Sequence, residues 1–280
     1  MTKVWQDGRI VGLTEAHISV ADRGFLLGDG LFETMPVHRG RLFDLDAHLA
    51  RLASGLVLLN LAGAVDLAKL RAGIADYLAA EDLASAVLRL TITRGYGSRG
   101  LLPPEAPCPT IVMTLSSLPP ARKEPLSLHV ATGTRRNECS PLSRIKALPY
   151  LDNMLALQEA RAHGADEAIL LNTRGNIACA SVANVFAVRE GRLETPPLSD
   201  GALPGTMRAL VLSLAKDLGL VPVDRSLNVE DLAAADEVFI TNSISRVMTV
   251  TECNGKPLGD RAGSALARLR ALIAMRFDAA

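Results

Sequence analysis

The sequence predicts an α+β protein of two domains. Short alternating segments typical of hairpin strands recur in both halves, leucines at helical spacing lie between them, and regular strand–helix–strand alternation is absent. A proline-rich charged stretch, Pro119 to Pro125, separates two strand-like runs. We therefore expect an N-terminal α/β domain at residues 1–118, a linker at 119–125 and a C-terminal domain at 126–280.

The composition excludes several classes of function. The chain has 280 residues, of which 49% are hydrophobic and 21% charged, and its formal net charge is zero. Zero net charge argues against nucleic acid or an anionic membrane as a partner, and no apolar run approaches the length of a membrane span. The 4 cysteines are widely spaced with no metal-ligand pairing, and the N-terminus shows no signal peptide. We expect a cytoplasmic protein with reduced thiols and no metal.

The first half begins with a predicted hairpin at Val4 to Ile10 and a further strand at Leu13 to Ser19. The glycine-containing segment from Asp22 to Thr34 lacks the third glycine of a dinucleotide site, so its spacing alone favours a turn between strands. Leucines at helical spacing predict a helix from Asp44 or Asp46, either of which can cap it, to about Leu59. A second amphipathic helix follows from Leu67 to Leu78.

Two arginines of this half are candidate anion ligands. Arg51 lies near the start of the first helix, where the helix dipole disfavours a cation unless an anion accompanies it. Arg51 is therefore a candidate phosphate ligand, with an exposed salt bridge as the alternative. The alternating strand at 86–94 runs into a glycine-rich loop that contains Arg99. This loop could close over a carboxylate, with Arg99 as a bidentate clamp, or it could be a flexible hairpin tip. Thr110 to Leu115 is the next strand.

The second half is organised around Lys146. It lies beyond a turn-rich run and just ahead of a predicted helix from Tyr150 to His163. A desolvated lysine forms Schiff bases with carbonyl compounds readily, whereas most isolated lysines are surface solubilisers. The turn-rich run itself follows a strand at 126–131, and further strands are expected after the helix, at 166–172, 176–179 and 184–188.

Two later segments could bind an anion. A helix that opens at Gly201 to Arg208 and runs to about Leu218 has a glycine-led start, which offers free backbone N–H groups to a phosphate. The strand at 237–241 ends in Thr241-Asn242-Ser243, a second possible anion-binding turn. A hairpin at Asn254-Gly255 and a terminal helix from Ala262 to Phe277 complete the expected elements.

Five separated motifs together resemble the fold-type IV pyridoxal-phosphate enzymes. This family holds branched-chain aminotransferases, D-amino-acid aminotransferases and 4-amino-4-deoxychorismate lyases. In the family's order, the motifs are Asp22-Arg-Gly-Phe-Leu-Leu-Gly-Asp-Gly-Leu-Phe-Glu-Thr34, His48-Leu-Ala-Arg51-Leu, Lys146, Asn184-Val-Phe186 and Leu203-Pro-Gly-Thr-Met-Arg208. The resemblance covers about Asp22 to Met248. It implies a two-domain fold like that of the D-amino-acid aminotransferases, a homodimer, a small-molecule substrate, and pyridoxal 5'-phosphate in the interdomain cleft, with residues 126–280 as the cofactor-binding domain.

The resemblance also implies a role for each site residue. Lys146 matches the Schiff-base lysine, and Tyr150 looks like the tyrosine near the cofactor phenolate. Asn184 belongs to the pair of motifs around the cofactor's ring and phosphate. The phosphate ligands implied are Arg51, the amides of Thr206 and Met207, and the run Thr241, Asn242 and Ser243.

Within the family, the stretch from Leu90 to Pro104 looks most like the deoxychorismate lyases. Arg99 matches a substrate-carboxylate arginine, and Thr34 sits where those lyases carry a catalytic threonine. Leu101 stands where the D-amino-acid enzymes have a histidine. The leading expectation is a 4-amino-4-deoxychorismate lyase that releases pyruvate and 4-aminobenzoate for folate biosynthesis. The alternatives are a D- or branched-chain amino-acid aminotransferase and a non-catalytic pyridoxal-phosphate-binding homologue.

One position departs from the family pattern. The residue five before Asn184 is normally a glutamate that pairs with the pyridine nitrogen, and here it is Cys179. A neutral thiol is a weak hydrogen-bonding partner and gives the ring little support as an electron sink. Because transamination depends heavily on that sink, Cys179 favours elimination. Its alternative role is that of a small buried core thiol.

Overall fold

The computed structural model describes residues 3–259 and 264–279, and the chain divides into two compact units. The first unit takes its residues from Met1–Pro119 and from Ile145–Pro149, and the second from Pro120–Arg144 and Tyr150–Ala279. The segment around Lys146 therefore belongs to the first unit, although the sequence analysis assigned it to the C-terminal domain.

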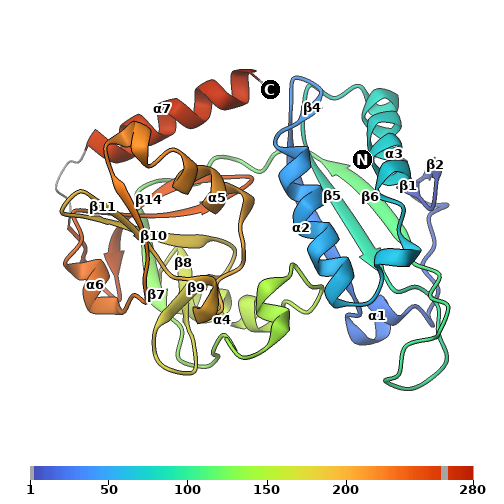
Figure 1. Cartoon of the computed structure of the whole chain (residues 1–280), viewed down its shortest axis with the longest axis horizontal. Coiled ribbons are helices and arrows are strands. Elements are labelled where there is room, and N and C mark those ends of the chain that lie inside the picture. The colour runs from blue at the N-terminus through green and yellow to red at the C-terminus, as the bar shows by residue number, and fades with distance from the viewer. Residues whose placement is uncertain (1–2, 260–263, 280) are drawn as a thin grey trace. The chain divides into compact units, whose positions relative to one another are not determined.

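The first unit is built on a six-stranded antiparallel sheet in the order β2-β1-β6-β5-β3-β4. Two helices, α2 (Leu45–Leu58) and α3 (Leu67–Glu81), cover one face of this sheet (Figure 1). A short helix α1 (Arg23–Leu27) precedes β3, and a 3-10 turn η1 (Ala62–Ala64) joins α2 to α3. The strands are β1 (Lys3–Gln6), β2 (Arg9–Gly12), β3 (Gly30–His38), β4 (Arg41–Leu42), β5 (Ser85–Thr93) and β6 (Ile111–Ser116).

Alternation along the strands determines which side chains enter the core of the first unit. Leu31, Met35 and Val37 of β3 pack with Leu52 and Leu56 of α2, and all are almost fully buried. Successive residues of a strand point to opposite faces, so Phe32 and Thr34 lie on the face that α2 does not cover. Each buried aliphatic side chain of this core contributes roughly 1.5–3 kcal/mol.

Three expectations for this half are corrected by the structure. Leu13 to Ser19 forms no strand, because the chain there is in turns and irregular backbone. The glycine-containing segment is not a plain turn, since Asp22 caps α1 by accepting from the amides of Gly24 and Phe25. Asp44 occupies the N-cap position of α2 with φ 56° but makes no side-chain capping bond.

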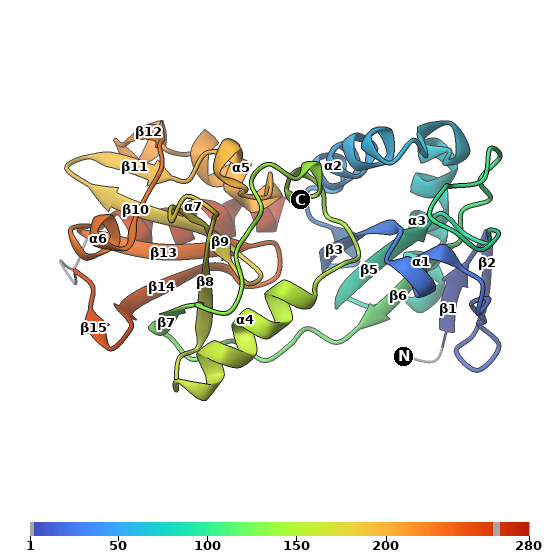
Figure 2. The same cartoon turned by 90° about the horizontal axis from the view of Figure 1, so that it is seen from below.

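The second unit is a mixed sheet in the order β12-β11-β10-β13-β14-β7-β8-β9, with β15 paired to β14. Helix α4 (Leu151–Ala162) packs along β7 and β8 (Figure 2), where its alanines Ala156 and Ala160 meet Ala168 and Leu170. The strands are β7 (Leu126–Val130), β8 (Glu167–Leu171), β9 (Ile177–Ala180), β10 (Asn184–Arg189), β11 (Arg192–Thr195), β12 (Val221–Asp224), β13 (Glu237–Asn242), β14 (Arg246–Cys253) and β15 (Lys256–Pro257).

The other helices of this unit surround the sheet. They are α5 (Thr206–Ser213), α6 (Val229–Ala233) and α7 (Ser264–Ala279), with 3-10 turns η2 (Pro141–Arg144), η3 (Leu198–Asp200) and η4 (Lys216–Leu218). The helix expected from Gly201 is shorter, since α5 begins at Thr206 and a 3-10 turn follows it. The expected start of the last helix, Ala262, lies outside the described residues. None of the described helices has the length and apolar character needed to cross a membrane.

Candidate functional site

Lys146 lies on a short segment that pairs with the start of β3. The Phe32 amide donates to the Lys146 carbonyl over 3.0 Å, and the Leu148 amide donates to the Gly30 carbonyl over 3.0 Å. Ile145 and Ala147 are buried in the core with α2. The Lys146 side chain between them leaves this core and lies against Phe32. Its Nζ lies 4.2 Å from the centroid of the Phe32 ring.

Two glycines of the first motif make room for this segment. A Cβ on Gly30 would lie 2.3 Å from the Ile92 carbonyl oxygen and 2.8 Å from a methyl of Leu148, so only glycine fits there. Gly28 has φ +68°, and a Cβ there would lie 2.9 Å from the ring of Pro149. The glycines that suggested a turn therefore seat the lysine segment against the sheet.

The uncovered face of the sheet brings three functional groups together. Thr34 follows Phe32 by two residues on β3 and shares its face. Arg89 of β5 is the register partner of Thr34, and its guanidinium carbon lies 4.1 Å from the centroid of the Phe32 ring. Lys146 thus shares one aromatic ring with Arg89, and both cations gain from its electron-rich face.

Sequence reasoning missed Arg89 and Phe32 as site residues. The alternation predicted for the strand at 86–94 places Arg89 on a polar face with Thr91 and Thr93. That alternation would have found it, since it places Arg89 on the same sheet face as Thr34 once β3 and β5 are paired.

Arg51 is held from the α2 side of the sheet by a buried carboxylate. Its Nε donates to Oε1 of Glu33 over 2.8 Å, and its Nη2 donates to Oε2 over 2.5 Å. Nδ1 of His48 lies 2.7 Å from the same carboxylate. Burial opposes ionisation of Glu33, but the hydrogen bonds and charges of Arg51 and His48 outweigh it, and the pKa of Glu33 lies below its usual value. The carboxylate therefore fixes the orientation of Arg51, whose role as a phosphate ligand stays a prediction.

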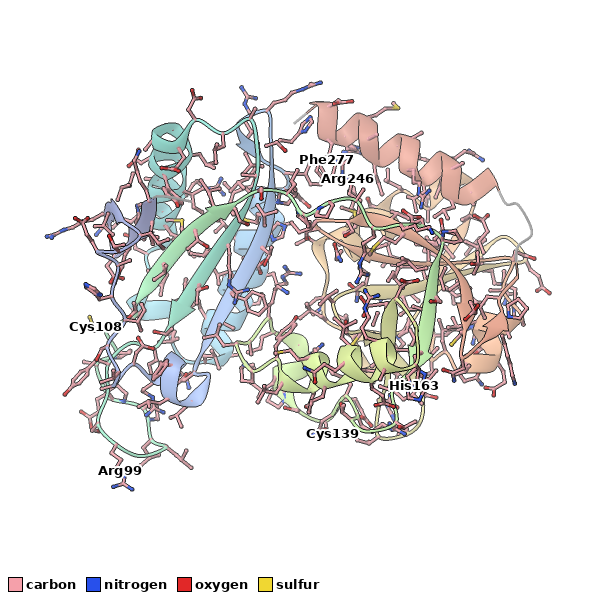
Figure 3. All side chains as sticks on the ribbon, turned by 180° about the vertical axis from the view of Figure 1, so that it is seen from behind. Arg99, Cys108, Cys139, His163, Arg246 and Phe277 are labelled. Carbon is pink, nitrogen blue, oxygen red and sulfur yellow. The ribbon has the colours of Figure 1, made fainter. Side chains whose placement is uncertain are left out.

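Arg99 lies on the loop that follows β5. Its side chain is exposed and projects from the far end of that loop (Figure 3). Within the first unit, the structure thus places Lys146 and Thr34 on one sheet face, Arg51 on the helix side, and Arg99 on a loop beyond the sheet.

In the second unit, the N-terminus of α5 meets the end of β13. The hydroxyls of Thr206 and Ser243 lie 3.0 Å apart, so the two predicted phosphate segments are neighbours. The Thr241 side chain is 1% exposed, and among the described residues its hydroxyl has no hydrogen-bond partner. Met207 follows Thr206 in the first turn, and no described side chain caps this helix. Hydroxyls that converge on the amides of a helix N-terminus in this way fit a phosphate group.

Asn184 and Asn242 shape this site through the backbone. The Asn184 amide donates to the Leu203 carbonyl over 2.9 Å, and a Cβ on Gly205 would lie 2.1 Å from Oδ1 of Asn184. Asn184 therefore fixes the entry of the chain into α5. Oδ1 of Asn242 accepts from the amides of Ile244 and Ser245, which closes the turn after β13.

Tyr150 and Cys179 complete the predicted set. Tyr150 is half-buried at the N-cap position of α4. Cys179 of β9 is 6% exposed and packs in a cluster of small side chains with Ala156 and Ala160 of α4. Burial raises the pKa of the Cys179 thiol, which keeps it neutral. That packing fits the core-thiol alternative, and the orientation of Cys179 toward a cofactor stays a prediction.

Known proteins resemble the chain over nearly its whole length. Residues 30–253 match the family described as amino-transferase class IV. A chain of Methanocaldococcus jannaschii assigned as a branched-chain-amino-acid aminotransferase is 33% identical over 260 residues, which cover 92% of this chain and 90% of the relative. The solved 4-amino-4-deoxychorismate lyase of Pseudomonas aeruginosa is 31% identical with a TM-score of 0.85, covering 96% of this chain and 97% of the lyase.

A further solved structure, the branched-chain amino acid aminotransferase of Escherichia coli, has a TM-score of 0.92 at 26% identity, covering 98% of this chain and 94% of that one. The expected α+β fold of the fold-type IV enzymes is thereby confirmed. These matches include both aminotransferases and a lyase, so they identify the family and leave the reaction open. The chain belongs to the class IV aminotransferase family, and it is an enzyme whose cofactor is pyridoxal 5'-phosphate.

Proposed function

We propose that this enzyme is a 4-amino-4-deoxychorismate lyase, which releases pyruvate and 4-aminobenzoate for folate biosynthesis. The observation that carries the proposal is that Thr34 lies on the same sheet face as Lys146, two residues along β3 from Phe32, whose ring Nζ contacts. Elimination needs a base for the carbon that bears the amino group and an acid for the leaving fragment. An amine and a hydroxyl on one face supply this pair.

The substrate class also fits the cations on this protein. Aminodeoxychorismate carries two carboxylates, one on the ring and one on the enolpyruvyl group. Arg89, on the face with Thr34, and Arg99, on its loop, are two guanidinium groups able to bind carboxylates in bidentate geometry. Arg89 is an addition to the expected site, and it supports a dianionic substrate.

In the proposed reaction, Lys146 removes the proton from the amino-bearing carbon. The bond between the neighbouring ring carbon and the enolpyruvyl oxygen then breaks, and its electron pair stays on that oxygen, toward which Thr34 directs a proton. Removal of the two groups leaves an aromatic ring, so the step gains a large driving force. When bound, pyridoxal phosphate supplies an electron-accepting ring at the carbon that loses its proton.

The cofactor phosphate would be held by hydroxyls, backbone amides and an arginine. We propose Arg51, the amides of Thr206 and Met207, and the hydroxyls of Thr241 and Ser243 as phosphate ligands, with Asn242 shaping the turn. The buried Thr241 hydroxyl supports this assignment, because an orphaned hydroxyl in the interior costs free energy until a partner arrives. Tyr150 would donate to the ring oxygen, and Asn184 fixes the start of α5.

Cys179 favours elimination over transamination. We propose that it stands beside the pyridine nitrogen, where a neutral thiol stabilises a positive charge on that nitrogen poorly. Transamination needs the ring to store the electron pair until it is reprotonated elsewhere. In elimination the electron pair moves on to the leaving oxygen, so a weaker electron sink slows elimination less than it slows transamination.

We further propose a cytoplasmic homodimer. Phe25 and Leu26 of α1 are 71% and 59% exposed, and Leu101 and Leu102 of the Arg99 loop are 82% and 86% exposed. The loop is bound to α1, so these apolar side chains gather at one end of the first unit. Exposed apolar patches mark interaction surfaces, and a second copy of the chain is the proposed occupant. Light scattering coupled to size-exclusion chromatography measures the resulting mass.

A substitution at Thr34 tests the lyase directly. Thr34→Val removes the hydroxyl and should lower kcat for 4-aminobenzoate release by roughly 10²–10⁴-fold, the usual range for a general acid. The matched control is Thr114→Val, on the same sheet face but two strands away, since Thr114 pairs with Arg89 on its far side. Equal rates for Thr34→Val and wild type would remove Thr34 from the mechanism.

The second candidate is a branched-chain or D-amino-acid aminotransferase, which the 33% identity to the Methanocaldococcus jannaschii protein favours. Purified enzyme incubated with aminodeoxychorismate should release pyruvate and 4-aminobenzoate. The same preparation given L-leucine, L-valine or D-alanine with 2-oxoglutarate should form little glutamate. Faster glutamate formation than 4-aminobenzoate release would reverse the assignment.

A further inference from the structure

Arg23 is a buried arginine whose guanidinium binds the loop that carries Arg99. Its side chain is only 5% exposed. Nη1 donates to the Gly100 carbonyl over 2.9 Å and, more weakly, to the Leu102 carbonyl over 3.4 Å. Nη2 donates to the Leu101 carbonyl over 2.9 Å. Three consecutive carbonyls directly after Arg99 thus converge on one cation.

The Arg23 guanidinium is oriented by the carboxylate of Asp29. Nε of Arg23 donates to Oδ2 of Asp29 over 2.9 Å, and Arg94 donates to the same oxygen over 2.8 Å. Burial opposes ionisation of Asp29, but these two arginines outweigh it, so the pKa of Asp29 lies below its usual value. A charged carboxylate therefore fixes the plane of the Arg23 guanidinium and turns its remaining N–H groups toward the loop.

Contacts at the base of the loop reinforce this arrangement. The Arg23 amide donates to the Gly95 carbonyl over 2.9 Å, and Asp22 forms a β-bridge with Tyr96. Gly97 packs directly on the arginine, since a Cβ there would lie 2.9 Å from Cδ of Arg23. Asp22 and Arg23 thus hold the base of the loop through their backbone, and the Arg23 side chain contacts Gly97 and the three residues after Arg99.

We propose that Arg23 is a positioning residue for Arg99. It acts on the backbone, and so it fixes the direction from which the exposed Arg99 side chain approaches a substrate carboxylate. A bidentate arginine–carboxylate contact loses much of its value when the arginine must first be ordered, because that entropy is then spent on binding. The inference rests on the proposed substrate role of Arg99, but the backbone clamp can be tested without it.

Trypsin reports the clamp independently of activity, because it cleaves the Arg99–Gly100 bond faster when the loop opens locally. Wild type and variants are compared at one protein concentration and at the same mass by light scattering, so that protection of the loop by the proposed second copy is equal in each. In the cofactor-loaded enzyme, Arg23→Ala should raise the cleavage rate at Arg99 roughly ten- to hundredfold, as expected for loss of charge-assisted hydrogen bonds. Arg23→Lys should recover little of the protection, because one ammonium cannot reach Asp29 and three carbonyls together. Mass spectrometry of early fragments identifies the cut.

Two further variants separate the clamp from general instability. Gly97→Ala keeps Arg23 but places a methyl against it, and should raise cleavage at Arg99 to an intermediate rate even where Arg23→Ala folds poorly. Arg268→Ala is the matched control. Arg268 also donates to two backbone carbonyls, those of Asp217 and Leu218, but these belong to η4 in the second unit. It should leave cleavage at Arg99 unchanged.

The kinetic arm tests the link to Arg99. Arg23→Ala should raise KM for aminodeoxychorismate about tenfold or more, with a smaller change in kcat and with the cofactor's absorbance and affinity unchanged. Wild-type cleavage rates in folded Arg23→Ala and Gly97→Ala would overturn the clamp. Faster cleavage with an unchanged KM would overturn the substrate role of Arg99 instead. If the wild-type enzyme does not turn over aminodeoxychorismate, the proposed lyase function is wrong. The comparison of trypsin cleavage rates does not depend on that result.

Discussion

The buried contact between Arg51 and Glu33 allows a structural role of Arg51 to be separated from a cofactor-binding role. Glu33 is 1% exposed and receives hydrogen bonds from two nitrogens of Arg51. Arg51→Ala leaves this carboxylate buried without the arginine, and breaking a buried ion pair from one side costs about 3–5 kcal/mol. If Arg51 also binds the cofactor phosphate, loss of that charge-assisted bond costs a further 1.5–3 kcal/mol or so in affinity. The dissociation constant should then rise about tenfold or more.

The double variant Glu33→Gln with Arg51→Ala distinguishes the two costs. Removing both charges relieves the unpaired carboxylate, so the double variant should regain about 1–3 kcal/mol of unfolding free energy relative to Arg51→Ala. It should not regain cofactor affinity, because the phosphate ligand is still missing. Urea denaturation of the cofactor-free protein gives the first quantity, and fluorescence titration with pyridoxal phosphate gives the second.

A control and a pH profile complete this test. Arg71→Ala breaks an exposed ion pair with Asp46, and it should change either quantity by less than about 1 kcal/mol. The pKa of Glu33 is depressed in the folded protein, so its stabilisation is present above the ordinary value of 4.5 and is lost as pH falls through the folded pKa. Glu33→Gln should lose less stability than wild type does as the pH falls below 4.5. If the double variant regains both stability and cofactor affinity, Arg51 supports cofactor binding only by stabilising the fold and does not bind the phosphate.

Three further outcomes are expected. Borohydride reduction followed by peptide mapping should place the pyridoxyl group on Lys146, and a label on another residue would remove Lys146 from its role. Cys179→Glu should raise the ratio of amino transfer to lyase turnover if residue 179 faces the pyridine nitrogen. If residue 179 is only a packed core position, it should instead yield an unstable protein, and a folded variant with an unchanged ratio would contradict the mechanistic argument. The pKa of Glu159 is lowered to about 2 by hydrogen bonds from the Thr132 hydroxyl and from backbone amides, so its contribution to stability should be present above pH 4.5 and disappear as pH falls toward 2. Calorimetry checks this prediction: below pH 4.5 the stability of Glu159→Gln should fall less steeply than that of wild type, because glutamine does not ionise.

Local signals in the sequence located most elements of the fold. The leucine spacing of α3 and the alternation of β5 each follow from a single face being buried, and both elements appear close to where the pattern predicts them. The segment from Asp22 to Thr34 was different, because its glycines serve neighbours more than a hundred residues away. A side chain at Gly28 or Gly30 would collide with Pro149 or Leu148. The spacing of residues within the segment cannot predict contacts with such distant residues.

In the candidate site too, some residues could be predicted from the sequence, and others depend on contacts between distant segments. Lys146 and Arg51 were candidates from their local sequence, and the family resemblance gave them roles. Glu33 was overlooked, because a carboxylate in a strand has no local pattern that reveals its partners. Those partners, His48 and Arg51, lie on α2. Arg89 was visible as a polar residue in an alternating strand, and only the pairing of β3 with β5 shows which other groups share its face.

The lysine segment has a consequence for how the chain folds during synthesis. Ile145 and Ala147 complete the apolar core of the first unit, yet the chain reaches them only after it has entered the second unit. The hydrogen bonds that Gly30 and Phe32 at the edge of β3 make with this segment therefore cannot form until residues 146–148 have been translated. A fragment that ends at the linker would present an incomplete core and an open strand edge. The first core can close only with the segment that carries Lys146, so a first unit without a complete core also lacks the Lys146 amine on its sheet face.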